Sequence, residues 1–324
     1  MTVARPPSPT PTARPSLRVV ATADLPGNSG STDIAIDPSR DHVYVLSADG
    51  LLVVLDTRTT TSVTTLSVGQ FAEGMTVDPV AGRIYVYFTR VSASPAGGSL
   101  SVIDGQTNTI VATIEPGVPG SFGAGIISVN PNTSCVYVGD FSSKVAVVDG
   151  ATNTMLGSLA VGGQPAGVAV DVPANRVFVL VRGLTSSIAV IDGLTNAIVD
   201  RFASGENPRA IAANPVTGRI YVTSGPGNGD GTLTVRDGAT GSILKTLPVM
   251  NRPEEMAVDP IANRIYVANV GSDTVSVIDG ARDELVGTAI VAHAMGLGIA
   301  VDPRTGRIYV VEQIRQPRSL QVLE

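Results

Sequence analysis

The hydrophobic and polar positions along the chain follow one pattern that recurs seven times. A short apolar stretch ends in Asp or Asn close to Pro, a turn follows, and a second apolar stretch reads HVYVL, RIYVY, CVYVG, RVFVL, RIYVT, RIYVA and RIYVV in the successive copies. A third stretch ends in Asp, usually before Gly, and a fourth is looser, as in TIVATIEPG at 109–117. Val, Ile and Tyr favour β-strands, so the pattern predicts four short strands in each copy.

The two ends of the pattern predict how the fold closes. Four-stranded units repeated about an axis form a β-propeller. The last copy stops after a third strand, SLQVLE at 319–324, whereas LRVVATADLPG at 17–27 matches the fourth-strand pattern. Leu17–Leu25 should therefore pair with the C-terminal blade. We predict an all-β, seven-bladed β-propeller of four-stranded antiparallel blades, forming a single domain over 17–324 after a flexible Pro-rich tail at 1–16.

The Tyr-Val copies resemble a known repeat family. GRIYVTS at 218–224 and NRIYVANVGSDTVSVIDG at 263–280 are similar to the YVTN repeats of seven-bladed propellers, within a superfamily of streptogramin-lyase-like and quinoprotein-amine-dehydrogenase-like members. The resemblance covers nearly all of the chain from Ser16 to Glu324. It implies a propeller scaffold and, through streptogramin lyase, chemistry that uses histidine, glutamate and a divalent metal. Only His293 lies in the connectors that would carry such chemistry, so the resemblance supplies no histidine pair.

Composition narrows the class of protein. Apolar residues make up 43% of the chain and charged residues 15%, which is ample for a large core. The net charge of -6 and the absence of a Lys/Arg block argue against nucleic acid as a partner. Cys135 is the only cysteine, which excludes an intramolecular disulfide. No apolar run is long enough for a membrane helix, and no signal-peptide core follows the tail, so we expect a cytoplasmic protein with no membrane partner.

Many polar and aromatic residues are interpreted as parts of the repeat. Aspartates that end the third strands should cap their turns, since Asp accepts hydrogen bonds from the backbone two or three residues on. These aspartates are Asp104, Asp149, Asp192, Asp237 and Asp279. One aromatic position per copy should pack between blades. It holds Tyr44, Tyr85, Tyr137, Phe178, Tyr221, Tyr266 and Tyr309.

The connectors that vary between copies are the expected location of function. Turns joining strands one to two and three to four are uniform, whereas those on the opposite face differ in length and content, and loops on a rigid scaffold carry function. Four of the six phenylalanines fall there, in copies two and three: Phe71, Phe88, Phe122 and Phe141. We interpret them as one wall of a pocket for a partly apolar ligand, with Arg90 beyond it; the alternative is that these loops pack on themselves.

A set of polar residues is expected nearer the axis. The starts of first strands hold Asp33, Glu73, Arg209, Glu254 and Glu255, the ends of second strands hold Asp140, Asn269 and Glu312, and the connectors hold Arg252 and His293. Of these, His293, Glu254, Glu255 and Glu312 are the candidate catalytic groups, and the others are candidate substrate-binding groups together with the phenylalanines. Converging carboxylates can bind Mg²⁺ or Ca²⁺, or raise the pKa of one acid so that it serves as a general base.

Two functions fit these residues. The first is an enzyme of lyase, cyclase or hydrolase type that acts on a small molecule at the variable face by acid/base or metal-assisted chemistry. The second is a non-catalytic platform for a protein partner on the same face, for which exposed aromatic side chains are equally suited.

Overall fold

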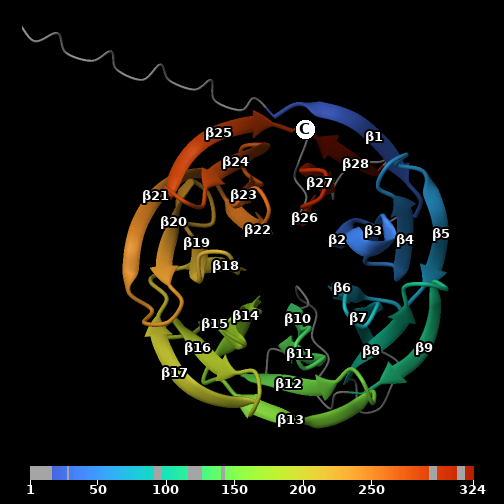
Figure 1. Cartoon of the computed structure of the whole chain (residues 1–324), viewed down its shortest axis with the longest axis horizontal. Coiled ribbons are helices and arrows are strands. Elements are labelled where there is room, and N and C mark those ends of the chain that lie inside the picture. Colours follow the sequence, from blue (N-terminus) through green and yellow to red (C-terminus); the bar gives the residue numbers. More distant parts are fainter. Residues whose placement is uncertain are drawn as a thin grey trace, which may run out of the picture.

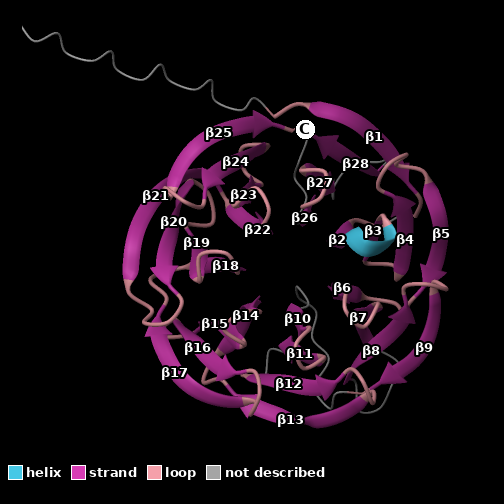
Figure 2. Ribbon diagram, viewed as in Figure 1, coloured by secondary structure: helices cyan, strands magenta, loops and turns pink. Residues whose placement is uncertain are grey.

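Seven four-stranded antiparallel sheets are arranged as blades around a central axis (Figure 1). The computed structural model describes residues 17–27, 29–90, 97–115, 126–139, 143–291, 298–311 and 318–324. Strands account for almost all of its regular structure, and the helix drawn in Figure 2 is one 3-10 turn, Pro38–Arg40. The predicted all-β propeller is confirmed.

Each blade runs from its first strand at the axis to its fourth strand at the rim (Figure 1). Blade 1 holds β2 (Ser31–Asp37), β3 (His42–Ser47), β4 (Leu51–Asp56) and β5 (Ser62–Ser67). Blade 2 holds β6 (Ala72–Asp78), β7 (Arg83–Arg90), β8 (Gly97–Asp104) and β9 (Thr109–Ile114). Blade 3 holds β10 (Ile126–Asn130), β11 (Cys135–Gly139), β12 (Lys144–Asp149) and β13 (Thr154–Ala160). Blade 4 holds β14 (Gln164–Asp171), β15 (Arg176–Arg182), β16 (Ser187–Asp192) and β17 (Ala197–Ala203).

The remaining blades repeat this order, and the last one joins the two ends of the described chain. Blade 5 holds β18 (Pro208–Asn214), β19 (Arg219–Ser224), β20 (Asp230–Asp237) and β21 (Ile243–Asn251). Blade 6 holds β22 (Pro253–Asp259), β23 (Arg264–Asn269), β24 (Thr274–Asp279) and β25 (Glu284–Ile290). Blade 7 holds β26 (Gly298–Asp302), β27 (Arg307–Val311), β28 (Arg318–Leu323) and β1 (Val19–Leu25).

Ring closure follows the predicted pairing. The strand β1 runs antiparallel to β28, from Val19 opposite Leu323 to Leu25 opposite Arg318. Just beyond this register, the Arg18 N–H donates to the Glu324 carbonyl at 3.0 Å, and the Glu324 N–H donates back to the Arg18 carbonyl at 3.1 Å. The two ends of the repeat thus complete one blade, as the missing fourth strand indicated.

The core lies between neighbouring blades. Second and third strands are apolar on both faces because each sheet is covered on both sides, and β3, β11 and β15 are buried along almost their whole length. The repeated aromatic side chains are buried there, as predicted, and several reach the next blade through their hydroxyls. Tyr85 donates to the Gly150 carbonyl at 3.3 Å, and Tyr309 donates to the Thr57 carbonyl at 3.0 Å.

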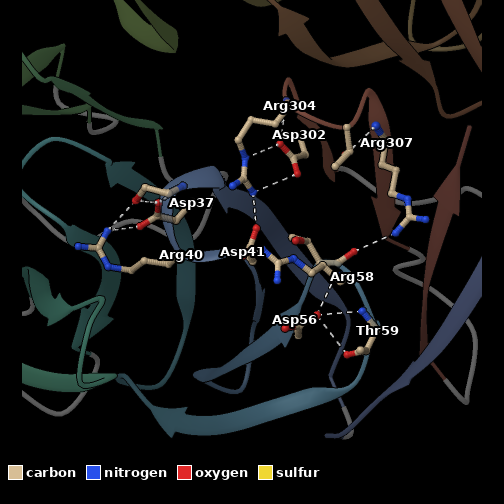
Figure 3. Close-up of polar contacts among 12 residues, drawn as sticks. Asp37, Arg40, Asp41, Asp56, Arg58, Thr59, Asp302, Arg304 and Arg307 are labelled. Carbon is tan, nitrogen blue, oxygen red and sulfur yellow. Dashed lines mark hydrogen bonds and ion pairs between the residues drawn. The ribbon is translucent and has the colours of Figure 1, made fainter.

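Uniform turns on one face fix the blades relative to one another. The Asp56 carboxylate accepts from the backbone N–H groups of Arg58 and Thr59, both at 2.8 Å (Figure 3). The five aspartates predicted to cap turns accept the same pair of backbone bonds in later blades. Across the closure, Arg304 of blade 7 donates to Asp41 of blade 1 at 2.6 Å. This face is a rigid scaffold, and its aspartates are occupied in structural contacts. No helix among the described residues is long and apolar enough to span a membrane.

Candidate functional site

The first strands of five blades lose their regular pairing at the end opposite the uniform turns. In five blades the register between the first and second strand shifts near the start of the first strand: between Ser31 and Asp33, Ala72 and Gly74, Pro165 and Gly167, Pro208 and Ile211, and Pro253 and Glu255. An extra residue in one strand re-aims the side chains around it, and such bulges are common beside active sites. Here they surround the axis.

A pocket of about 430 Å³ opens at these strand starts. Residues from the first strand of every blade line it, which places it on the axis of the ring; we call it the axial pocket. Its size lies within the roughly 300–1,000 Å³ typical of small-molecule sites.

One apolar side chain from each blade forms a ring around this pocket. The seven residues occupy the same register position, since each pairs with the Val of its own blade's aromatic-Val motif. They are Ile34, Met75, Ile127, Val168, Ile211, Met256 and Ile299. This apolar ring gives the axial pocket an apolar lining directly beside its charged groups.

Asp33 and Glu255 precede the apolar ring on blades 1 and 6. The half-buried Asp33 carboxylate accepts from the N–H of Ile34 and, across to blade 2, from the N–H of Met75, both at 2.7 Å. Burial outweighs these two bonds and raises the pKa of Asp33 to about 7.

Glu255 is enclosed by the channel walls even though its side chain is exposed to the water in the pocket. Loss of hydration between the walls of the axial pocket, followed by the negative charges of Asp33 and Glu254, raises the pKa of Glu255 to about 8. A ligand that displaced the pocket water would favour the protonated form further. The two carboxyls can therefore exist in different protonation states near neutral pH, which is what general acid–base chemistry requires.

Two arginines line the axial pocket on blades 4 and 5, and blade 5 lies next to blade 6, which carries Glu254 and Glu255. Arg182 donates from Nε to the Pro208 carbonyl at 2.8 Å and from Nη2 to the Arg209 carbonyl at 3.3 Å. Arg209 Nη1 lies 3.3 Å from Glu254 Oε1, and Arg252 Nε lies 3.6 Å from the same oxygen. Burial, with the charge of Arg209, lowers the pKa of Arg182. The pocket thus combines carboxyls from blades 1, 2 and 6 with guanidiniums from blades 4 and 5.

Only some of the predicted polar residues come together in the axial pocket. Glu73, Arg209, Glu254 and Glu255 all line the axial pocket, and Glu73 accepts from the Thr89 hydroxyl at 2.6 Å. Arg252 is not among its lining residues and contacts the pocket through Glu254. Asn269 is buried in blade 6, where its amide donates to the Ser276 hydroxyl at 2.9 Å and joins β23 to β24.

Phe71 and Phe88 are the two predicted pocket phenylalanines within the described residues, and neither lines the axial pocket. Phe88 lies within β7 rather than after it, so its assignment to a connector is wrong; it packs against the core between blades 1 and 2, with its ring over Gly69. Phe71 is 42% exposed and adopts a φ of 55° just before β6. Phe122, Phe141, Asp140, His293 and Glu312 lie outside the described residues, as does the side chain of Arg90.

Arg182 is the charged residue of the pocket lining that the sequence did not lead us to predict, and the residues of the apolar ring were not predicted either. Arg182 ends the apolar second strand of blade 4, RVFVLVR, in a position where a charge departs from the repeat. That departure was the available signal. Within the described parts of the chain, no group of three or more His, Cys, Asp or Glu side chains could hold a metal ion.

Comparison with known proteins supports the fold. No protein-family model matches the chain, and no curated protein matches it by sequence. Among solved structures, hydrazine synthase of Kuenenia stuttgartiensis is similar, with a TM-score of 0.75 and 18% identity over 90% of this chain and 95% of that one. The chain is a seven-bladed β-propeller. At this level of identity the likeness extends to the fold alone.

Proposed function

We propose that the chain is an enzyme of lyase, cyclase or hydrolase type that binds a small organic molecule in the axial pocket. Glu255, assisted by Asp33, exchanges a proton with that molecule. The observation that carries the proposal is the presence of two carboxyls at the same strand position on blades 1 and 6, facing one pocket, with pKa values raised to about 7 and about 8. Asp104 and Asp237, which cap the turns after two third strands, have lowered pKa values by contrast.

The two carboxyls can supply the acid and the base of a proton transfer. Below pH 8 Glu255 is mainly protonated and can donate a proton to a leaving group, while Asp33, with the lower pKa, is the first of the two to ionise. Proton transfer between a carboxyl and a bound molecule is favoured where apolar walls restrict the access of water, and the apolar ring supplies such walls.

Metabolite profiling tests this proposal. Purified protein is incubated with a metabolite extract, and the extract is compared before and after, with Glu255→Gln as the test variant and Glu284→Gln as the control. Glu284 lies on the rim strand β25 and is exposed, so its substitution leaves the pocket intact. We expect a metabolite that the wild type and the control consume and Glu255→Gln does not. Equal consumption by all three proteins would refute the role of Glu255.

We also propose that the chain is a member of the YVTN-repeat propellers. The support is the recurrence of the aromatic-Val motif in all seven copies, with the aromatic ring buried between blades each time. This membership concerns the scaffold and leaves the chemistry of the axial pocket to be established separately.

A protein-interaction platform is the second candidate function. The observation in its favour is Phe71, a large aromatic side chain that is 42% exposed in the loop leading into β6. Exposed aromatic residues are enriched at binding surfaces. If affinity capture from a lysate yields a partner that Phe71→Ser loses and Glu255→Gln retains, while the extract stays unchanged, the platform replaces the enzyme.

A further inference from the structure

We propose that Arg182 and Arg209 form an anion-binding subsite, so that the ligand of the axial pocket carries an anionic oxygen group, a carboxylate or a phosphate. The assignment of this group to a substrate rests on the proposed function. The anion site itself rests on its own contacts and can be tested without any turnover.

A second hollow meets the axial pocket at these two arginines. It measures about 290 Å³ and is lined by Arg182, Gly183, Ser186, Asn207, Pro208 and Arg209. Arg182 and Arg209 also line the axial pocket, so both guanidiniums face the junction of the two hollows. A group bound at the junction can extend into the axial pocket towards the apolar ring.

Both guanidiniums are held in place yet keep donors for a ligand. Arg182 uses Nε and Nη2 on backbone carbonyls, and among the described residues its Nη1 has no acceptor. Arg209 uses Nε on the Gly225 carbonyl at 3.4 Å and Nη1 on Glu254, and its Nη2 likewise meets no acceptor in the described part of the chain. Anchored guanidiniums lose little freedom on binding, and their planar forks match carboxylate and phosphate oxygens.

Charge at the junction favours an anion. Arg182 and Arg209 line the junction, and the Glu254 carboxylate that pairs with Arg209 is shared with Arg252, so positive charge is in excess there. Arg209 lies close enough to lower the pKa of Arg182, so the two cations repel each other. An anion between them removes that repulsion. This local excess stands against the net charge of -6 of the whole chain.

The ligand class follows from the residues that share the pocket. An anionic group bound at Arg182 and Arg209 leaves the rest of the molecule in the axial pocket, which the apolar ring, Asp33 and Glu255 also line. The molecule is therefore a small organic anion with an apolar part and a group that can give or take a proton.

Calorimetric titration with inorganic phosphate and with acetate, at constant ionic strength set by sodium chloride, tests the subsite. We expect Arg209→Gln and Arg182→Met to weaken binding of the preferred anion about tenfold or more, the loss expected for a charge-assisted hydrogen bond. Arg58→Gln is the control, because Arg58 pairs with Asp41 on the opposite, uniform face. Preference for acetate indicates a carboxylate ligand, and preference for phosphate indicates a phosphorylated one.

The variant Glu254→Gln separates a loss of the anion site from a loss of folding, because it should increase the affinity for the anion. Removing the Glu254 carboxylate that pairs with Arg209 should tighten anion binding several-fold, a gain that a damaged protein would not show. Unchanged affinity in both Glu254→Gln and Arg209→Gln, or binding of neither anion above chloride, would overturn the subsite. If anions bind as expected but Glu255→Gln consumes metabolites like the wild type, the proposed function fails and the subsite stands.

Discussion

Glu255 and Asp33 place ionisable side chains at a repeat position, directly before the apolar ring, that is uncharged in the other blades. Five of the seven blades hold Gly, Ala or Ile at this position: Gly74, Ile126, Gly167, Ala210 and Gly298. Gly298 belongs to blade 7, which lies between the blades of the two acids, and has no side chain to separate them. The negative charge of Asp33 therefore reaches Glu255, and together with enclosure by the walls it holds the Glu255 proton near neutral pH.

Asp33→Asn should lower the pKa of Glu255 from about 8, because it removes a nearby negative charge that disfavours ionisation. The amide oxygen of Asn can still accept one of the two backbone bonds that Asp33 makes. Carbon-13 NMR titration of labelled Glu carboxyls measures the shift, with Asp200→Asn on the rim strand β17 as the control. An unchanged Glu255 titration in Asp33→Asn would mean that the two carboxyls are not coupled.

Features within one blade could be predicted from the sequence, whereas polar contacts between blades could not. Strand order, turn caps and ring closure were predictable because the residues that specify them are close neighbours or recur in every copy, as with Asp237 and the aromatic-Val motif. The contact of Asp33 with Met75 joins two blades, and that of Arg182 with Pro208 depends on a loop carbonyl. Such contacts arise only once the ring is closed, so a pattern along the chain did not reveal them.

Turn caps make a measurable contribution to each blade. The Asp237 carboxylate accepts from the N–H groups of Ala239 at 2.9 Å and Thr240 at 2.8 Å, and these bonds lower its pKa. Asp237→Ala should reduce the free energy of unfolding by about 1 kcal/mol, since it leaves both turn donors to water. Urea denaturation measures this, with Asp200→Ala as the control. A loss no larger than in the control would show that the turn holds without its cap.

The whole molecule depends on the pairing of its two ends. Blades 1 and 6, which carry Asp33 and Glu255, are the neighbours of blade 7, and blade 7 is complete only when β1 pairs with β28. The core between blades 7 and 1 includes Leu25 from β1 and Leu320 and Val322 from β28, all buried. Stability and the coupling of the two carboxyls should therefore be lost together when closure fails.

Deleting residues 1–27 removes β1, uncovers Leu320 and Val322, and leaves β28 as an open sheet edge. We expect a melting temperature several degrees lower, in line with the loss of a few kcal/mol of buried apolar contact, together with self-association, since an open edge pairs with other chains. Differential scanning calorimetry and light scattering measure the two effects, and deletion of residues 1–16 alone is the matched control. Identical melting of the two truncated proteins would show that the ring holds without its closing strand, and the Glu255 titration in the shorter protein would then report whether blade 7 still brings the two acids together.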